Sequence, residues 1–242
     1  MLKDVCENLE FSQENNRGET AATETSEPLD NEAAGLLKNA LFFFSLAFRY
    51  PRETVYEELG RLLPVFEEFF EAYAGNYPEL PEIIDLQAEY IQLFVNSRGG
   101  VPVVPYASYH LDNGILRGES YYRLCRIMEK AGFVLDDSAG ELEDHLAILL
   151  EFSSMLADRL INVSTSGEPP ANEIREIFCE VIIRYLRPVM KAVLEKFSTC
   201  KMMDFYILSA RALFNFLADM EEIYAYVFDV PMEPDISTGV KK

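Results

Sequence analysis

Histidine and cysteine are scarce in this sequence, and neither residue type is spaced like a metal-ligand set. The 242 residues include two histidines, His110 and His145, and four cysteines. No CxxC pair and no HExxH motif is present, so the chain lacks the usual spacing of a zinc site and the dense cysteine framework of small secreted domains. We therefore expect free thiols in a reducing compartment and no bound metal.

Basic residues are also few. Lysine and arginine together number 21 against 41 aspartates and glutamates, which gives a formal net charge of -20. Such a charge repels a polyphosphate backbone and argues against nucleic-acid binding. It would attract a cationic peptide over about 8–10 Å at ordinary salt, although solubility alone also accounts for it.

Long apolar runs are missing. The start of the chain, Met1 to Glu7, has no basic segment followed by an apolar segment of the kind that forms a signal peptide. The most apolar run, Ala40 to Phe48, is interrupted by Ser45 and is shorter than the ~20 residues that span a bilayer. We expect a cytoplasmic protein.

Strand-like alternation is absent, and apolar residues recur at intervals of three and four, which is typical of helices. The predicted fold is an all-α, single-domain helical bundle with a long ordered loop between central helices. We expect an acidic tail over residues 1–30, a helical domain over 31–230 and a second tail over 231–242. The expected helices are Glu32–Phe48, Glu53–Ala74 with a kink at Pro64, Pro81–Asn96, Ser120–Ala131, Gly140–Ile161, Pro170–Phe197 with a disturbance at Pro188, and Cys200–Phe228. A connecting loop is expected at Ser164–Pro169.

The loop from Gly99 to Gly118 is a first candidate site, since loops this long in compact domains are usually functional or disordered. It is rich in tyrosine and proline, a composition that can hold an extended peptide at low entropic cost. The alternative is that these rings only seal the loop onto the core. That alternative is favoured for Phe94, whereas for Tyr106 and Ser108 the two interpretations are balanced.

The segment from Glu141 to Phe152 is a second candidate. Read as a helix, it places Glu141, Asp144 and His145 on one side, where they could bind a guanidinium or act as an acid–base pair. No nucleophile elbow, phosphate-binding loop or Rossmann glycine pattern accompanies them, so we expect no enzymatic activity and no cofactor. The structural alternatives are a capping box from Ser138 to Glu141 and a buried histidine that ties the helix to the loop.

In this region the sequence resembles the TorD/DmsD/NarJ-like family of redox-enzyme maturation chaperones. Tyr90-x-x-Leu93-Phe94, Pro105-Tyr106-Ala107-Ser108 and Gly118 match the family's aromatic-x-x-Leu-Phe, Pro-aromatic-x-Ser and glycine features in order. Glu141-x-x-Asp144-His145 resembles the family's Glu-Pro-x-Asp-His motif, with Leu142 in place of the proline. The resemblance is carried by residues 88–155.

The resemblance implies a cytoplasmic chaperone that binds the twin-arginine signal peptide and the apo-form of a molybdopterin-containing oxidoreductase, assists cofactor insertion and delays export. It implies a monomer or a helix-swapped dimer and leaves the client enzyme open. The alternative is a general helical adaptor that binds no signal peptide. The predicted peptide-binding residues are Tyr90, Leu93, Phe94, Pro105, Tyr106, Ser108, Gly118, Glu141, Asp144 and His145.

Overall fold

The computed structural model describes residues 31–228, except 99, 136–139, 163–170 and 198–203. The two predicted tails and the connecting loop at Ser164–Pro169 lie outside the described residues, so the predicted domain boundaries stay a prediction. Within the described residues there is no β-strand, which confirms the all-α prediction. The helices are α2 (Asn31–Ala47), α3 (Glu53–Leu62), α4 (Glu67–Ala74), α5 (Ile83–Tyr90), α6 (Ala107–Leu111), α7 (Glu119–Lys130), α8 (Leu146–Ile161), α9 (Ala171–Val181), α10 (Arg187–Phe197) and α11 (Asp204–Phe228).

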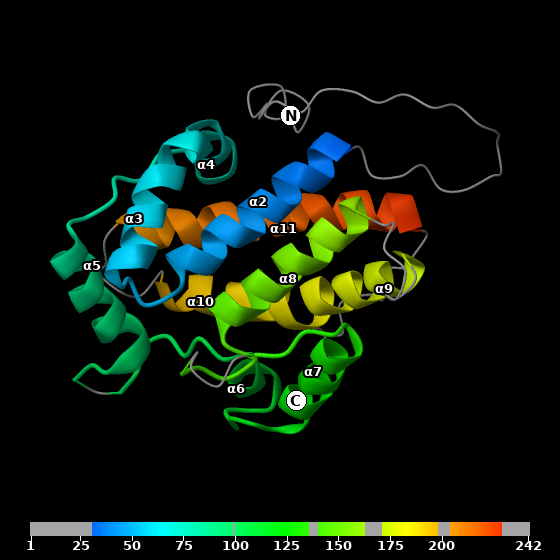
Figure 1. Cartoon of the computed structure of the whole chain (residues 1–242). Coiled ribbons are helices and arrows are strands. Elements are labelled where there is room, and N and C mark those ends of the chain that lie inside the picture. The colour runs from blue at the N-terminus through cyan, green and yellow to red at the C-terminus, as the bar shows by residue number, and fades with distance from the viewer. Residues whose placement is uncertain (1–30, 99, 136–139, 163–170, 198–203, 229–242) are drawn as a thin grey trace, which may run out of the picture.

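The core forms where α2 packs along α8, with α11 lying behind α2 and packing against α4 and α10 (Figure 1). The apolar faces of these helices supply a buried cluster that runs from Leu36 to Met220. Phenylalanines dominate the end near α4, where the rings of Phe43 and Phe66 stack at 4.6 Å between centroids. Aromatic burial of this kind dominates core energetics and fixes how the helices cross.

Two prolines interrupt the helical pattern where the sequence predicts. Pro64 lies in the 3₁₀ turn η1 (Leu63–Phe66), which separates α3 from α4. Pro188 has no backbone N–H to offer the carbonyl of Arg184, and a wide π-helical turn, η4 (Ile182–Leu186), separates α9 from α10 there. Both predicted disturbances are confirmed.

The expected loop contains the short helix α6. One prediction about the segments around the candidate site is wrong, because α8 begins at Leu146 rather than at Gly140. The cause is an isolated antiparallel bridge between Tyr106 and His145, which holds His145 extended at φ -65° and ψ 136°. Glu141 and Asp144 therefore lie before the helix and not on its face, and no capping box at Glu141 starts α8.

Candidate functional site

The two predicted segments lie side by side. The backbone N–H of Leu146 donates to the carbonyl of Pro105 at 2.7 Å, and that of Ala107 donates to the carbonyl of Asp144 at 2.9 Å. These bonds join the loop before α6 to the residues that lead into α8. The loop and the Asp144–His145 segment thus form one structural unit.

The buried side chain of Asp144 helps to hold these two segments together. Asp144 is fully buried, and one carboxylate oxygen accepts a 2.8 Å hydrogen bond from the backbone N–H of Ser108, in the first turn of α6. Burial raises the pKa of the Asp144 carboxyl above its ordinary value, although the bond from Ser108 opposes that shift. Asp144 positions the start of α6 and exposes no side-chain surface to solvent.

His145 is the N-cap of α8. Its Nδ1 accepts a 3.2 Å hydrogen bond from the backbone N–H of Ala147, so the neutral ring carries its proton on Nε2. The side chain is 2% exposed, and burial lowers its pKa to about 3. The imidazole packs edge-to-face against the Tyr106 ring, with 5.2 Å between the ring centroids. This contact ties the loop to the helix, which is one of the structural alternatives that the sequence left open for His145.

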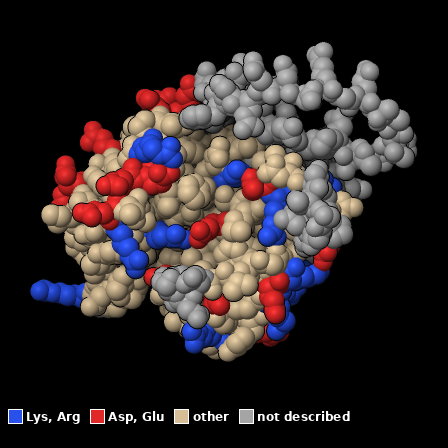
Figure 2. Space-filling view, in the orientation of Figure 1, with Lys and Arg blue, Asp and Glu red and all other residues tan. Residues whose placement is uncertain are grey.

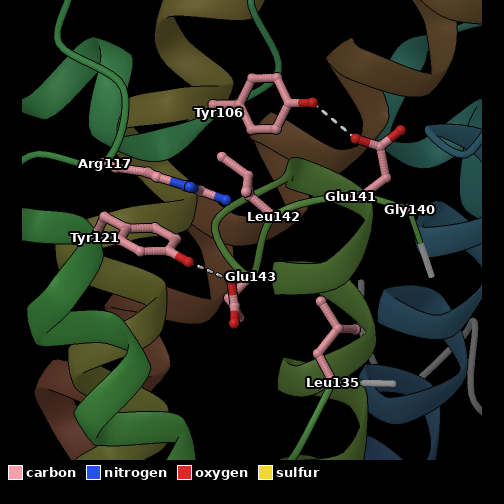
Figure 3. A pocket seen from close by; sticks show the side chains of 8 residues that line it. All are labelled: Tyr106, Arg117, Tyr121, Leu135, Gly140, Glu141, Leu142 and Glu143. Carbon is pink, nitrogen blue, oxygen red and sulfur yellow. Dashed lines mark hydrogen bonds between the residues drawn. The ribbon is translucent and has the colours of Figure 1, made fainter. Parts of the chain in front are cut away.

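A surface pocket of about 370 Å³ opens beside this unit, and Figure 3 shows the side chains around it. The hydroxyl of Tyr106 donates to Glu141 Oε2 at 2.7 Å, and that of Tyr121 donates to Glu143 Oε2 at 2.6 Å. Desolvation, reinforced by these hydrogen bonds, raises the pKa of both tyrosines, so both stay protonated donors at neutral pH. The lining residues are Tyr106, Arg117, Tyr121, Leu135, Gly140, Glu141, Leu142 and Glu143.

The structure divides the predicted site residues between this pocket and the interior. Tyr106 and Glu141 line the pocket, whereas Ser108, Asp144 and His145 lie buried behind it. The remaining apolar and aromatic candidates are also buried. The hydrophobic core includes Tyr90, Leu93 and Phe94, and Pro105 is buried in the loop before α6. Direct contact between a peptide and these buried side chains stays a prediction.

Sequence reasoning missed several pocket residues, and Glu143 is the most informative. Glu141, Leu142 and Glu143 follow one another in a bend and a turn, where the backbone N–H of His145 donates to the carbonyl of Leu142 at 3.0 Å, and all three residues line the pocket. The helical interpretation of this stretch hid the pair. Arg117 and Tyr121, from the loop before α7 and from α7 itself, gave no pattern in the sequence that connects them with Glu141.

Gly118 shapes the site by allowing close contact with Asp112. A Cβ built on Gly118 would lie 2.3 Å from the Asp112 Oδ2 atom, which accepts hydrogen bonds from the backbone N–H and the hydroxyl of Ser120 at the start of α7. We expect Gly118→Ala to lower the free energy of unfolding by about 1–2 kcal/mol, because Asp112 must move and release this cap.

Gly60→Ala provides the matched control for that substitution. Gly60 is exposed inside α3, and its added Cβ would meet only Leu80 at an ordinary 3.7 Å. The Gly60→Ala substitution should raise the free energy of unfolding by about 0.5–1 kcal/mol, since alanine favours the helix. Urea unfolding gives the free energy of unfolding of both variants. If Gly118→Ala is as stable as wild type, the close contact between Gly118 and Asp112 does not require glycine.

Within the described residues, no helix combines the length and the apolar character needed to cross a bilayer. The described residues also contain no group of three or more metal-ligating side chains that could hold a metal ion.

Fold and site together define an all-helical protein whose surface pocket combines tyrosine hydroxyls, paired carboxylates and one arginine. The chain belongs to the nitrate reductase delta subunit family, whose model matches residues 52–191. That match covers the candidate pocket and the helices from α3 to α9. It confirms the resemblance to TorD/DmsD/NarJ-like proteins noted from the sequence.

Curated relatives and one solved structure add narrower likenesses. The chain is 34% identical over 74 residues to "Chaperone protein TorD" from three strains of Vibrio cholerae serotype O1, which is 31% of this chain and 33% of each relative. The alignment thus spans about a third of the length of those relatives. A solved structure of a candidate redox enzyme maturation protein from Archaeoglobus fulgidus is 26% identical, covers 75% of this chain and 93% of its own, and has a TM-score of 0.48.

Proposed function

We propose that this chain is a cytoplasmic maturation chaperone whose pocket binds the twin-arginine signal peptide of a molybdopterin-containing oxidoreductase. In this role it holds the apo-enzyme, assists cofactor insertion and delays export until folding is complete. Its activity is binding and not catalysis. Family membership supports the chaperone role, and the paired carboxylates of the pocket support the recognition of arginine.

The observation that carries the proposal is the Glu141–Glu143 pair. Each carboxylate has one oxygen bound by a tyrosine hydroxyl, which fixes the side chain and leaves acceptor sites for a ligand. A guanidinium presents a planar fork of donors that matches a carboxylate, and charge-assisted bonds of this kind are about twice as strong as neutral ones. Two adjacent arginines would meet two carboxylates.

The surroundings of the pocket suit the rest of such a peptide. Ile115 and Leu116, which precede the pocket residue Arg117, are 60% and 48% exposed and offer apolar contact to the segment that follows the arginines. The net charge of -20 favours the approach of a cationic peptide. On the face drawn in Figure 2, part of this negative charge is visible as acidic side chains over the α3–α4 corner, which lies apart from α6 and α7 (Figure 1).

Calorimetric titration of a peptide with two adjacent arginines and an apolar run tests the proposal. We expect the double variant Glu141→Gln/Glu143→Gln to bind at least tenfold more weakly than wild type, because each lost charge-assisted bond is worth about 1.5–3 kcal/mol. Glutamine keeps the acceptor for each tyrosine, so the fold should persist. A peptide with lysines in place of both arginines should also bind more weakly.

The control is Glu57→Gln/Glu71→Gln, which makes the same change in net charge at exposed positions on α3 and α4. It should change the affinity less than twofold at 0.15 M salt. Undiminished binding by the pocket variant would contradict the proposed recognition. Failure to bind any such leader, by the wild type and also after removal of the Arg117 side chain from the pocket, would instead favour the general helical adaptor.

A further inference from the structure

Arg117 has an unusual backbone conformation for an arginine. Its φ of 56° lies in the left-handed region, which residues with a Cβ rarely adopt. Two neighbouring contacts hold it there: its N–H donates to the hydroxyl oxygen of buried Ser108 at 3.1 Å, and the next residue, Gly118, packs tightly on Asp112. These contacts constrain the backbone of Arg117, whereas its side chain can still rotate.

That side chain extends into the candidate pocket. Its Cζ atom lies 5.9 Å from the centroid of the Tyr121 ring, within cation–π range, and Figure 3 shows it reaching between the two tyrosines toward Leu142. Among the ion pairs between described residues none includes Arg117, although Glu141 and Glu143 line the same pocket. The guanidinium of Arg117 therefore already lies in the pocket that would receive an arginine of the peptide.

We propose that Arg117 is an internal competitor that occupies the arginine pocket and must swing out before a twin-arginine peptide can bind. The inference rests on the proposed function and adds a regulatory residue to that site. Two ligand guanidiniums bound at Glu141 and Glu143 would share the pocket with the Arg117 guanidinium, and like charges at such short range repel one another. The long arginine side chain can rotate into solvent while its strained backbone stays in place.

The competition has a measurable cost in affinity. When only a fraction of the protein is in the state that can bind, the apparent Kd equals the intrinsic Kd divided by that fraction, so the affinity falls. Removing the Arg117 side chain should therefore tighten binding, whereas removing a residue that contacts the ligand would weaken it. The direction of the effect separates the two roles.

The test is calorimetric titration of the paired-arginine peptide into Arg117→Ala, Arg117→Gly and wild type. Both variants should bind about 3–10-fold more tightly than wild type. The glycine variant guards against misfolding, since glycine adopts a positive φ without strain. The matched control is Arg126→Ala, which removes the same charge from an exposed position on α7 outside the pocket and should change the affinity less than twofold.

Each outcome either supports or rules out Arg117 as a competitor. Tighter binding by both Arg117 variants but not by Arg126→Ala supports the competitor, as does binding that appears only once Arg117 is removed. If wild type binds and the Arg117 variants bind equally or more weakly, or if Arg126→Ala gains as much, the competitor is ruled out while the proposed function stands. If neither wild type nor variants bind, both the competitor and the proposed function are wrong.

Discussion

Replacing Asp144 with alanine is expected to lower the free energy of unfolding by about 3 kcal/mol. The substitution removes the acceptor for the buried N–H of Ser108 and leaves a void, and an unsatisfied buried donor alone costs about 1–3 kcal/mol. Thermal unfolding should show a loss of roughly 6–12 °C for a domain of this size. Amide hydrogen exchange at Ser108 should accelerate, because that N–H loses its partner.

Asp144→Asn is the informative comparison, since its side-chain oxygen can still accept from Ser108. Burial raises the pKa of Asp144, because burial disfavours the charged carboxyl more than the neutral one. Asparagine would place its N–H2 group where Asp144 Oδ1 has no hydrogen-bond partner, so it should cost about 1–2 kcal/mol, less than alanine. A surface change, Asp85→Ala on α5, should stay within about 1 kcal/mol of wild type. Equal losses for the alanine and asparagine variants would contradict this account of Asp144.

His145 should make the protein lose stability in acid. Its pKa is about 3 when folded and about 6.5 when unfolded, so below pH 6.5 the unfolded chain binds a proton that the folded protein excludes. Stability from this group is complete above pH 6.5 and declines as the pH falls toward 3. Between pH 7.5 and pH 4.5 the expected loss is about 2–3 kcal/mol.

His145→Asn isolates that contribution. Asparagine is a good N-cap and can accept the N–H of Ala147 as the imidazole does, but it does not titrate. Urea unfolding across the pH range should give a shallower acid decline for the variant than for wild type. Parallel curves would show that His145 is not the buried, neutral group described here.

Local signals in the sequence were sufficient to predict most of the helices. Prolines at 64 and 188 disturb the helical pattern in the sequence and in the structure, because proline lacks an N–H wherever it lies. Apolar residues at intervals of three and four likewise identify the faces that form the core. These effects depend on neighbours within a few residues, so a sequence displays them directly.

The candidate site depends on contacts between distant segments, and there the sequence was less informative. The bridge between Tyr106 and His145 holds His145 extended, so α8 begins after it, against a local pattern that favours a helix. The left-handed conformation of Arg117 is likewise imposed by its tertiary contacts with Ser108. The motif residues identify two segments that border the pocket, while several of the side chains that reach the pocket came from elsewhere.

The central claim is that the pocket between Tyr106 and the Glu141–Glu143 pair receives the arginines of a signal peptide. Photo-crosslinking tests it most directly, with a paired-arginine peptide that carries a photoreactive phenylalanine next to the arginines and with the attachment sites located by mass spectrometry. We expect attachment at residues 106, 117, 121 or 140–143, competed away by the unlabelled peptide. Specific attachment confined to another surface, such as the exposed face of α9 and α10, would contradict the account.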